Sequence, residues 1–174
     1  SSRSWRQLTP DIKAVHYAHF ANDREILFSS KHLGNWQIYR LDLANEQVTT
    51  VTKAGGYSVQ VGANNREIIY SKFDQPGLFR MNLTDGQEQL LLPDFAITSW
   101  NRWLYRQNAI FYIAPDSIKA MSLENGETKI ILAHENDVPN NFAVSADGAY
   151  VVKTRLEEMN TDLWQVNLIK ANVP

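Results

Sequence analysis

A strand motif returns four times along this chain at a nearly constant spacing. Each copy is a polar turn followed by an apolar run of β-branched and aromatic residues, and the copies cover residues 22–28, 64–70, 107–112 and 146–152. Equivalent positions lie 42, 42 and 40 residues apart, from 24 to 66, from 66 to 108 and from 108 to 148. A second strand repeats in the same register, at residues 38–43, 78–83, 118–123 and 163–168. Two strands that repeat together at a period of about 40–45 residues are typical of an array of four-stranded units.

These repeats predict an all-β fold, a β-propeller with four blades of four antiparallel strands and no helix. The chain is expected to form a single domain, residues 1–174, whose blades cover residues 13–52, 55–92, 97–132 and 137–168. The inner strand comes first in each blade, and the four inner strands are expected at residues 15–20, 58–62, 99–104 and 141–144. Outer strands are expected at residues 47–51, 88–92 and 128–132. They follow turns rich in Asn, Asp and Gly, which tolerate positive φ.

The two ends of the repeat array complement each other. The fourth unit has no outer strand after Leu168, whereas residues 4–9 precede the first inner strand as a spare strand. We therefore expect Trp5–Thr9 to pair with the strand at residues 163–168, which would close the ring and remove two exposed edges. The alternative is a segment of a larger propeller, in which both edges stay open.

Composition limits the classes of function. Hydrophobic residues make up 44% of the 174 positions, which is typical of a globular protein, and no apolar run approaches the roughly 20 residues that span a bilayer. The formal net charge of −2 gives this domain no electrostatic reason to bind nucleic acid. The chain has no cysteine, so it has neither a disulfide nor a thiolate metal site. It begins with Ser1 and not Met, so we expect it to be a piece of a longer protein.

Two of the repeats resemble the TolB-type, WD-like propeller repeat, whose core reads Phe-Ser-Pro-Asp-Gly-x-x-Ile-Ala-Phe. The segments that carry the resemblance are residues 20–29 and 144–152. In this chain Ala146 stands where the motif has Pro, and the motif's glycine is kept only at Gly148. The resemblance implies a TolB-like β-propeller.

The segments at residues 36–43 and 162–168 are also similar to the C-terminal half of CadC-like membrane-bound bacterial regulators. In those proteins a winged-helix DNA-binding domain is joined through one transmembrane helix to a periplasmic propeller. The resemblance implies a non-catalytic sensory or interaction domain in the periplasm, with DNA binding left to a missing N-terminal domain and no membrane contact by this piece. A cytoplasmic location stays open, because the chain contains no feature that fixes the compartment.

A second class of function stays open as well. The propeller could be an accessory domain of a prolyl-oligopeptidase-type hydrolase, or a TolB-like protein-interaction scaffold. The flanking sequence separates the two classes. A winged helix and one apolar 20-mer upstream would indicate the regulator, and a Gly-x-Ser-x-Gly hydrolase downstream would indicate the protease.

The residues that could carry chemistry do not form a recognisable catalytic or metal-binding motif. His16 and His19 lie three apart on a predicted strand, so their side chains point to opposite faces unless a bulge intervenes. The sequence has no Gly-x-Ser-x-Gly motif, and the acidic pair Glu157 and Glu158 is typical of a solvated turn. We therefore expect no enzymatic activity, no metal and no cofactor.

Superposing the repeats brings polar and aromatic residues to the starts of the inner strands, which converge on the central channel of a propeller. The candidate binding residues at this channel mouth are His16, Tyr17, Trp100, Asn101, Asn140 and Asn141. They are suited to a protein or a small polar ligand, and a second copy of the chain is a further candidate partner. The alternative is that these side chains only fill a narrow channel.

The tryptophans divide into two predicted groups. Trp36 and Trp164 lie at or near third strands, where a large aromatic ring typically fills the space between blades. Trp100 and Trp103 depart from the repeat pattern, so they are the candidates for an exposed binding surface.

Overall fold

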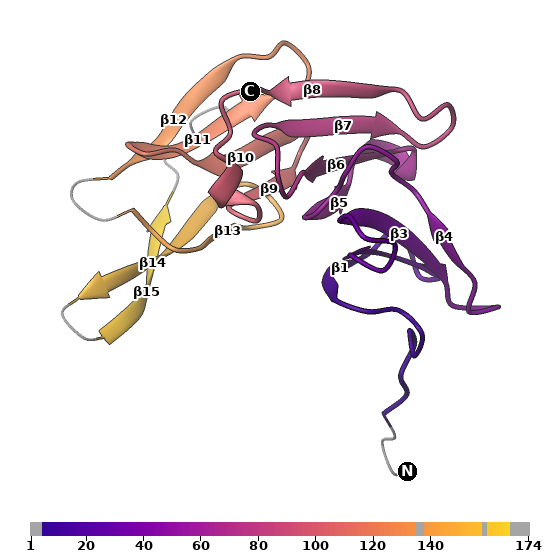
Figure 1. Cartoon of the computed structure of the whole chain (residues 1–174). Helices are drawn as coiled ribbons and strands as arrows, with labels where there is room; N and C mark the ends of the chain where they lie inside the picture. The colour runs from indigo at the N-terminus through magenta and orange to yellow at the C-terminus, as the bar shows by residue number, and fades with distance from the viewer. Residues whose placement is uncertain (1–4, 135–137, 158–159, 168–174) are drawn as a thin grey trace. The chain divides into compact units, whose positions relative to one another are not determined.

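The computed structural model describes residues 5–134, 138–157 and 160–167 (Figure 1). These residues form fifteen strands and two short 3-10 turns, η1 (Ala63–Asn65) and η2 (Ile97–Ser99). The strands are β1 (Val15–Phe20), β2 (Glu25–Ser30), β3 (Gln37–Asp42), β4 (Val48–Thr50), β5 (Val59–Val61), β6 (Glu67–Ser71), β7 (Leu78–Asn82), β8 (Glu88–Leu92), β9 (Trp103–Arg106), β10 (Ala109–Ile113), β11 (Ser117–Ser122), β12 (Thr128–Ala133), β13 (Phe142–Val144), β14 (Tyr150–Glu157) and β15 (Asn160–Asn167). No helix in these ranges is long and apolar enough to span a membrane.

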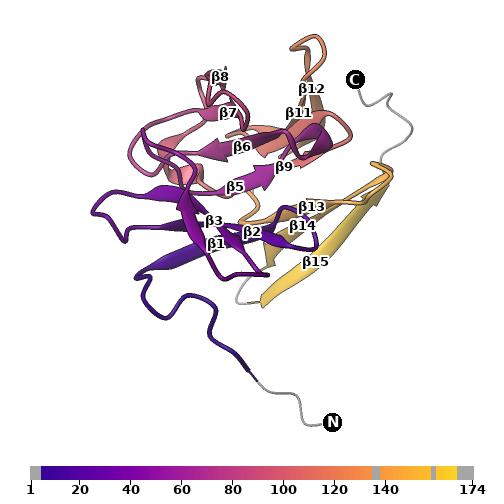
Figure 2. The ribbon, with the colours of Figure 1, turned by 90° about the vertical axis from the view of Figure 1, so that its right-hand side faces the viewer.

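The chain divides into two compact units, Ser1–Ile97 (unit 1) and Thr98–Pro174 (unit 2). Unit 1 holds two antiparallel sheets, β1-β2-β3-β4 and β5-β6-β7-β8, and Figure 2 shows them lying next to each other. The two sheets share one register, because Leu27 pairs with Arg40 in the first and Ile69 pairs with Arg80 in the second. The predicted first and second blades are therefore confirmed as four-stranded meanders.

Unit 2 holds the sheet β9-β10-β11-β12 and, within its described residues, the three-stranded sheet β13-β14-β15. In the first of these sheets Phe111 pairs with Ala120, in the register that the repeat predicts. The all-β prediction is confirmed. The prediction that residues 1–174 form a single domain stays a prediction.

The turns between third and outer strands are built alike in three blades. A polar side chain at the end of the third strand accepts a hydrogen bond from the backbone two residues on, as Asp42 does from Ala44 N at 2.8 Å. The same bond runs from Thr84 N to Asn82 Oδ1 and from Glu124 N to Ser122 Oγ. Side-chain bonds of this kind fix tight turns and compete with continuation of the strand.

Second and third strands supply the core of each unit. In unit 1, Leu27 and Ile38 of the first sheet pack with Ile68, Tyr70 and Phe79 of the second. In unit 2, a separate cluster joins the two sheets and contains Ala109, Phe111, Ile118, Ala120, Phe142, Val144 and Val151. Each large apolar side chain buried in this way contributes about 1.5–3 kcal/mol. Packing between sheets within a unit therefore stabilises the pairwise arrangement of the blades.

The described residues before β1, from 5 to 9, form no strand. Leu8 and Ile12 pack against the cluster of Phe28, Tyr39 and Leu41 on the first sheet. The fourth sheet has no outer strand among its described residues. That Trp5–Thr9 pairs with β15 and closes the ring stays a prediction. Ser4 and the region after Asn167 lie outside the described residues.

The inner strands depart from the prediction in the third blade. Residues 99–104 were expected to form a strand, but η2 and a following turn occupy residues 97–102, and β9 begins at Trp103. The turn is closed by Arg102 N, which donates to Ser99 O at 2.7 Å, and by Trp103 Nε1, which donates to Trp100 O at 2.9 Å. Two short 3-10 turns therefore stand in a chain for which no helix was predicted.

Candidate functional site

Five aromatic side chains meet at one end of the sheets of unit 1. They are His16, Tyr17, Trp36, Tyr57 and Phe73. Tyr57 lies at the centre, with ring centroids 4.7 Å from Trp36, 4.9 Å from Tyr17 and 5.1 Å from Phe73. Burial raises the pKa of the Tyr57 hydroxyl, so this group stays protonated at neutral pH and bonds to His16 Nδ1 at 3.1 Å.

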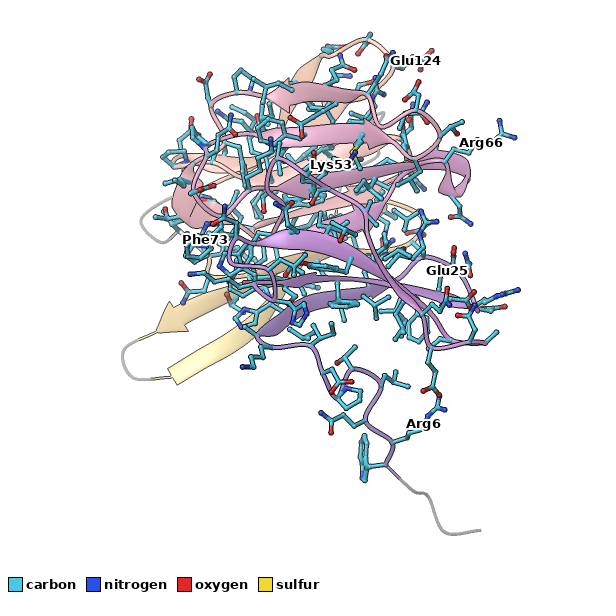
Figure 3. The ribbon with its side chains drawn as sticks, turned by 45° about the vertical axis from the view of Figure 1, so that its right-hand side comes forward. Arg6, Glu25, Lys53, Arg66, Phe73 and Glu124 are labelled. Carbon is cyan, nitrogen blue, oxygen red and sulfur yellow. The ribbon has the colours of Figure 1, made fainter. Side chains whose placement is uncertain are left out.

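The strand order brings these residues together. The β2–β3 connection, the β4–β5 connection and the β6–β7 connection all leave an antiparallel meander at the same end, and they carry Trp36, Tyr57 and Phe73 respectively. Figure 3 shows Phe73 at this end of unit 1, with Glu25 and Arg66 at the opposite end. Residues that lie far apart in the sequence therefore form one surface.

A bulge in β1 places His16 in this cluster. His16 pairs with Ser29 and His19 pairs with Leu27, so three residues on β1 span two on β2. Tyr17 takes up the extra residue at φ 45°, an uncommon conformation for a large side chain. Because their partners lie on one face of β2, His16 and His19 share that face, which the prediction excluded unless a bulge intervened. No group of three potential metal ligands occurs in the part of the chain that the structure describes.

An open pocket of about 690 Å³ lies beside the aromatic cluster. Its volume is within the range of about 300–1,000 Å³ that small-molecule sites have. Side chains from the same three connections line it: Lys31, Asn35, Trp36, Lys53, Phe73, Asp74 and Gln75. The pocket therefore combines two aromatic rings with amines, amides and one carboxylate.

The Gln37 side chain fixes the connection that carries Lys53. Its Oε1 atom accepts hydrogen bonds from Thr52 Oγ at 2.8 Å and from Gly55 N at 3.1 Å, and its Nε2 atom donates to Lys53 O. Thr52 is buried, and its Oγ also accepts a bond from Ile38 N. The backbone around Lys53 is thus ordered before any ligand arrives, which lowers the entropic cost of binding.

Lys72 precedes the pocket residue Phe73 in the sequence, and its side chain is buried. Its Nζ lies 2.9 Å from Glu88 Oε1 and 4.2 Å from the centre of the Phe79 ring, and its side chain is 4% exposed. Glu88 also accepts a short hydrogen bond from the Tyr70 hydroxyl. Burial, followed by this contact with Glu88, raises the pKa of Tyr70 far above its ordinary value. This polar network supports the sheet, and its amine does not line the pocket.

The six residues predicted to form a channel mouth fall in both units. His16 and Tyr17 belong to the aromatic cluster of unit 1. In unit 2, Asn101 is exposed in the turn before β9, and Asn140 Oδ1 lies 3.4 Å from Arg102 Nη2. Asn141 Oδ1 accepts a bond from Phe142 N beside a small hollow of about 120 Å³. That the six residues form one site stays a prediction.

One prediction for tryptophan is wrong: Trp103 was expected on the surface but is buried, at 3% exposure, while Trp100 is half-buried. Trp36 was expected to pack between blades, and its ring does pack on Tyr57 and Phe73 of the second blade. It is also half-buried and lines the pocket, which was not predicted. The side chain of Trp164 lies outside the described residues. Sequence reasoning missed Lys31, Lys53 and Phe73, although their position after second and outer strands was a usable signal.

Solved structures show which fold this is. No family model and no curated protein sequence matches the chain. TolB from Acinetobacter baumannii is similar at 17% identity and a TM-score of 0.63, over 83% of this chain and 38% of that one. An oligogalacturonate lyase in complex with manganese gives 17% identity and a TM-score of 0.67, over 95% of this chain and 54% of that one.

The extracellular domain of the one-component system BT4673 from B. thetaiotaomicron is also similar, at 15% identity and a TM-score of 0.58. The match covers 87% of this chain and 22% of that one. This chain thus spans about half or less of each of these three proteins. Likeness at such low identity shows the fold alone, and that fold is a β-propeller of the TolB-like type.

Proposed function

We propose that this chain is the sensory domain of a bacterial membrane-bound transcriptional regulator, and that it binds a ligand in the periplasm without chemical conversion. The observation that carries the proposal is the open pocket beside the aromatic cluster of unit 1. Its walls are exposed aromatic, amide and amine groups on connections held in place by internal hydrogen bonds. Such a surface is built to recognise a ligand, because it offers contact area and polar specificity together.

The regulator assignment has two supports. The sequence is similar to CadC-like regulators at residues 36–43 and 162–168. Among proteins of similar fold, the BT4673 domain is named as the extracellular domain of a one-component or hybrid two-component system, so a fold of this type occurs in the extracellular part of a signalling protein. The DNA-binding and membrane-spanning parts would lie in other segments of the full-length protein.

The experiment replaces the chromosomal gene by a version that encodes Trp36→Ala and Lys53→Ala in the full-length protein. Transcripts of this strain are compared with those of the wild type and of a deletion strain. We expect the variant to reproduce the deletion for a small set of genes while the protein accumulates to the normal level. Lys129→Ala is the matched control, because this lysine lies on β12 of unit 2. A deletion that changes no transcript would refute the proposal.

A further inference from the structure

The floor of the pocket is a platform and not a cage. Trp36 and Phe73 form this platform: both residues line the pocket, and their ring centroids lie 5.8 Å apart with the planes 32° from each other. Behind them Tyr57 packs on both rings, and His16 packs on Trp36 at 4.8 Å. The rings fill the space between themselves, which leaves no room for an enclosed cation of the kind that aromatic cages hold. A flat ligand face can lie on such a platform.

The rim of the pocket carries an excess of positive charge. Lys31 and Lys53 come from different connections and are both exposed, against one carboxylate, Asp74. Within the ranges that the structure describes, neither lysine has an ion-pair partner, in contrast with Lys72 and Glu88. Two amines from different connections favour a ligand with negative charge.

The remaining lining groups favour a sugar acid over a phosphate as the ligand. Asn35 and Gln75 each offer amide donors and an acceptor at the edge of the platform, which matches ligand hydroxyl groups. The described lining contains no arginine, the residue whose fork binds phosphate through two parallel bonds. The carbon-bound hydrogens on one face of a sugar ring carry partial positive charge, and they stack on the negative face of an aromatic ring.

We propose that this pocket binds an acidic saccharide, with one sugar face on Trp36 and Phe73 and a carboxylate between Lys31 and Lys53. The inference rests on the proposed function, since it names the ligand class of the same site. It goes beyond that function by predicting that affinity depends on ligand charge and on the platform together.

The test is calorimetric titration of the purified chain with three acidic trimers: trigalacturonate, trimannuronate and triglucuronate. We expect at least one to bind, and its fully methyl-esterified form to bind about tenfold more weakly. The Lys31→Ala and Lys53→Ala variants should each weaken binding about two- to fivefold, because exposed ion pairs contribute modestly. Trp36→Ala should weaken it at least about tenfold, and Lys129→Ala should leave it unchanged. Unfolding midpoints identify any variant that no longer folds.

Three outcomes would overturn the inference. They are the absence of binding by all three trimers, equal binding of the methyl ester, and equal binding of triglutamate or inorganic phosphate. Because Lys53 is exposed, Lys53→Ala should fold even if Trp36→Ala does not, and it keeps the charge prediction testable. If the trimers fail while the transcriptional response still depends on Trp36 and Lys53, the ligand class is wrong and the proposed function stands. If no transcript depends on them, the proposed function fails independently.

Discussion

Removing the charge of Glu88 should destabilise unit 1 far more than removing that of an exposed acid. Glu88 is the ion-pair partner of Lys72, whose side chain is 4% exposed, and it accepts the hydrogen bond of Tyr70. In Glu88→Gln the shape is kept, but Lys72 and Tyr70 contact different carboxylate oxygens, and the amide has only one oxygen that can accept. The variant therefore loses one acceptor together with the negative charge that compensates a buried ammonium group.

The magnitude follows from the exposure of the two partners. Breaking a fully buried ion pair on one side costs about 3–5 kcal/mol, whereas an exposed pair contributes about 0–1 kcal/mol. The Glu88 side chain is 32% exposed, so solvent screens part of the interaction. We expect a loss of about 2 kcal/mol in the free energy of unfolding, which lowers the unfolding midpoint by about 4–8 °C for a chain of this size.

Urea unfolding of four proteins measures the effect: the wild type, Glu88→Gln, Lys72→Met and the double variant. Lys72→Met keeps the apolar stem of the side chain, so the double variant should be about as stable as Lys72→Met alone. The cycle should give a coupling energy of about 1–2 kcal/mol. Glu46→Gln is the control, because the Arg6–Glu46 pair has both side chains more than half exposed. A loss of stability in Glu88→Gln no larger than that in Glu46→Gln would refute the reasoning.

Three further predictions concern other parts of the fold. Gly56→Ala should cost about 1–3 kcal/mol, because the added Cβ would lie 2.8 Å from the buried side chain of Ile38, and chemical unfolding measures the loss. Trp103→Ala should lower the free energy of unfolding by about 3 kcal/mol in the same assay, because the side chain is buried. A loss under about 1 kcal/mol would contradict this burial. The hydrogen bond from Arg24 lowers the pKa of Asp42, so this pair stabilises the fold above the ordinary pKa of aspartate, about 4, and its contribution is lost as the pH falls. Urea midpoints at pH 7 and pH 3 should therefore differ less in Arg24→Gln than in the wild type, and an unchanged difference would contradict this assignment.

The second strands were predictable because both of their faces are buried, so each face must carry apolar side chains. Leu27, Phe28, Ile68 and Ile69 are all at most 1% exposed, so both sides of β2 and β6 must be apolar. The turns after third strands were predictable for a different reason. Asp42 and the residues at its equivalent positions bond to their own backbone, and this local bond needs no tertiary context.

The inner-strand positions equivalent to Val59 were assigned two residues too early in the last two blades. Strand pairing makes Val59, Trp103 and Ala143 equivalent, since their partners Tyr70, Tyr112 and Val152 are 42 and 40 residues apart. A constant offset instead selected Asn101 and Asn141. The paired inner-strand and second-strand residues lie 11 apart in the second blade, at Val59 and Tyr70, but 9 apart in the third and fourth blades, so the hairpin that joins these strands is two residues shorter there. Spacing measured on buried strands cannot register such a change in a surface connection.

The pocket could not be predicted from the repeated strands, because its residues lie on the connections between strands. The β2–β3 and β6–β7 connections, residues 31–36 and 72–77, are each six residues long and carry the platform rings Trp36 and Phe73. The equivalent β10–β11 connection is only residues 114–116, closed by a bond from Ala114 N to Ser117 O at 2.8 Å. Strand residues repeat because each blade must bury the same faces, while connections are free of that requirement. We therefore expect the proposed ligand specificity to reside in residues that break the repeat, and the connections of the first two blades carry such residues, Trp36 and Phe73 among them.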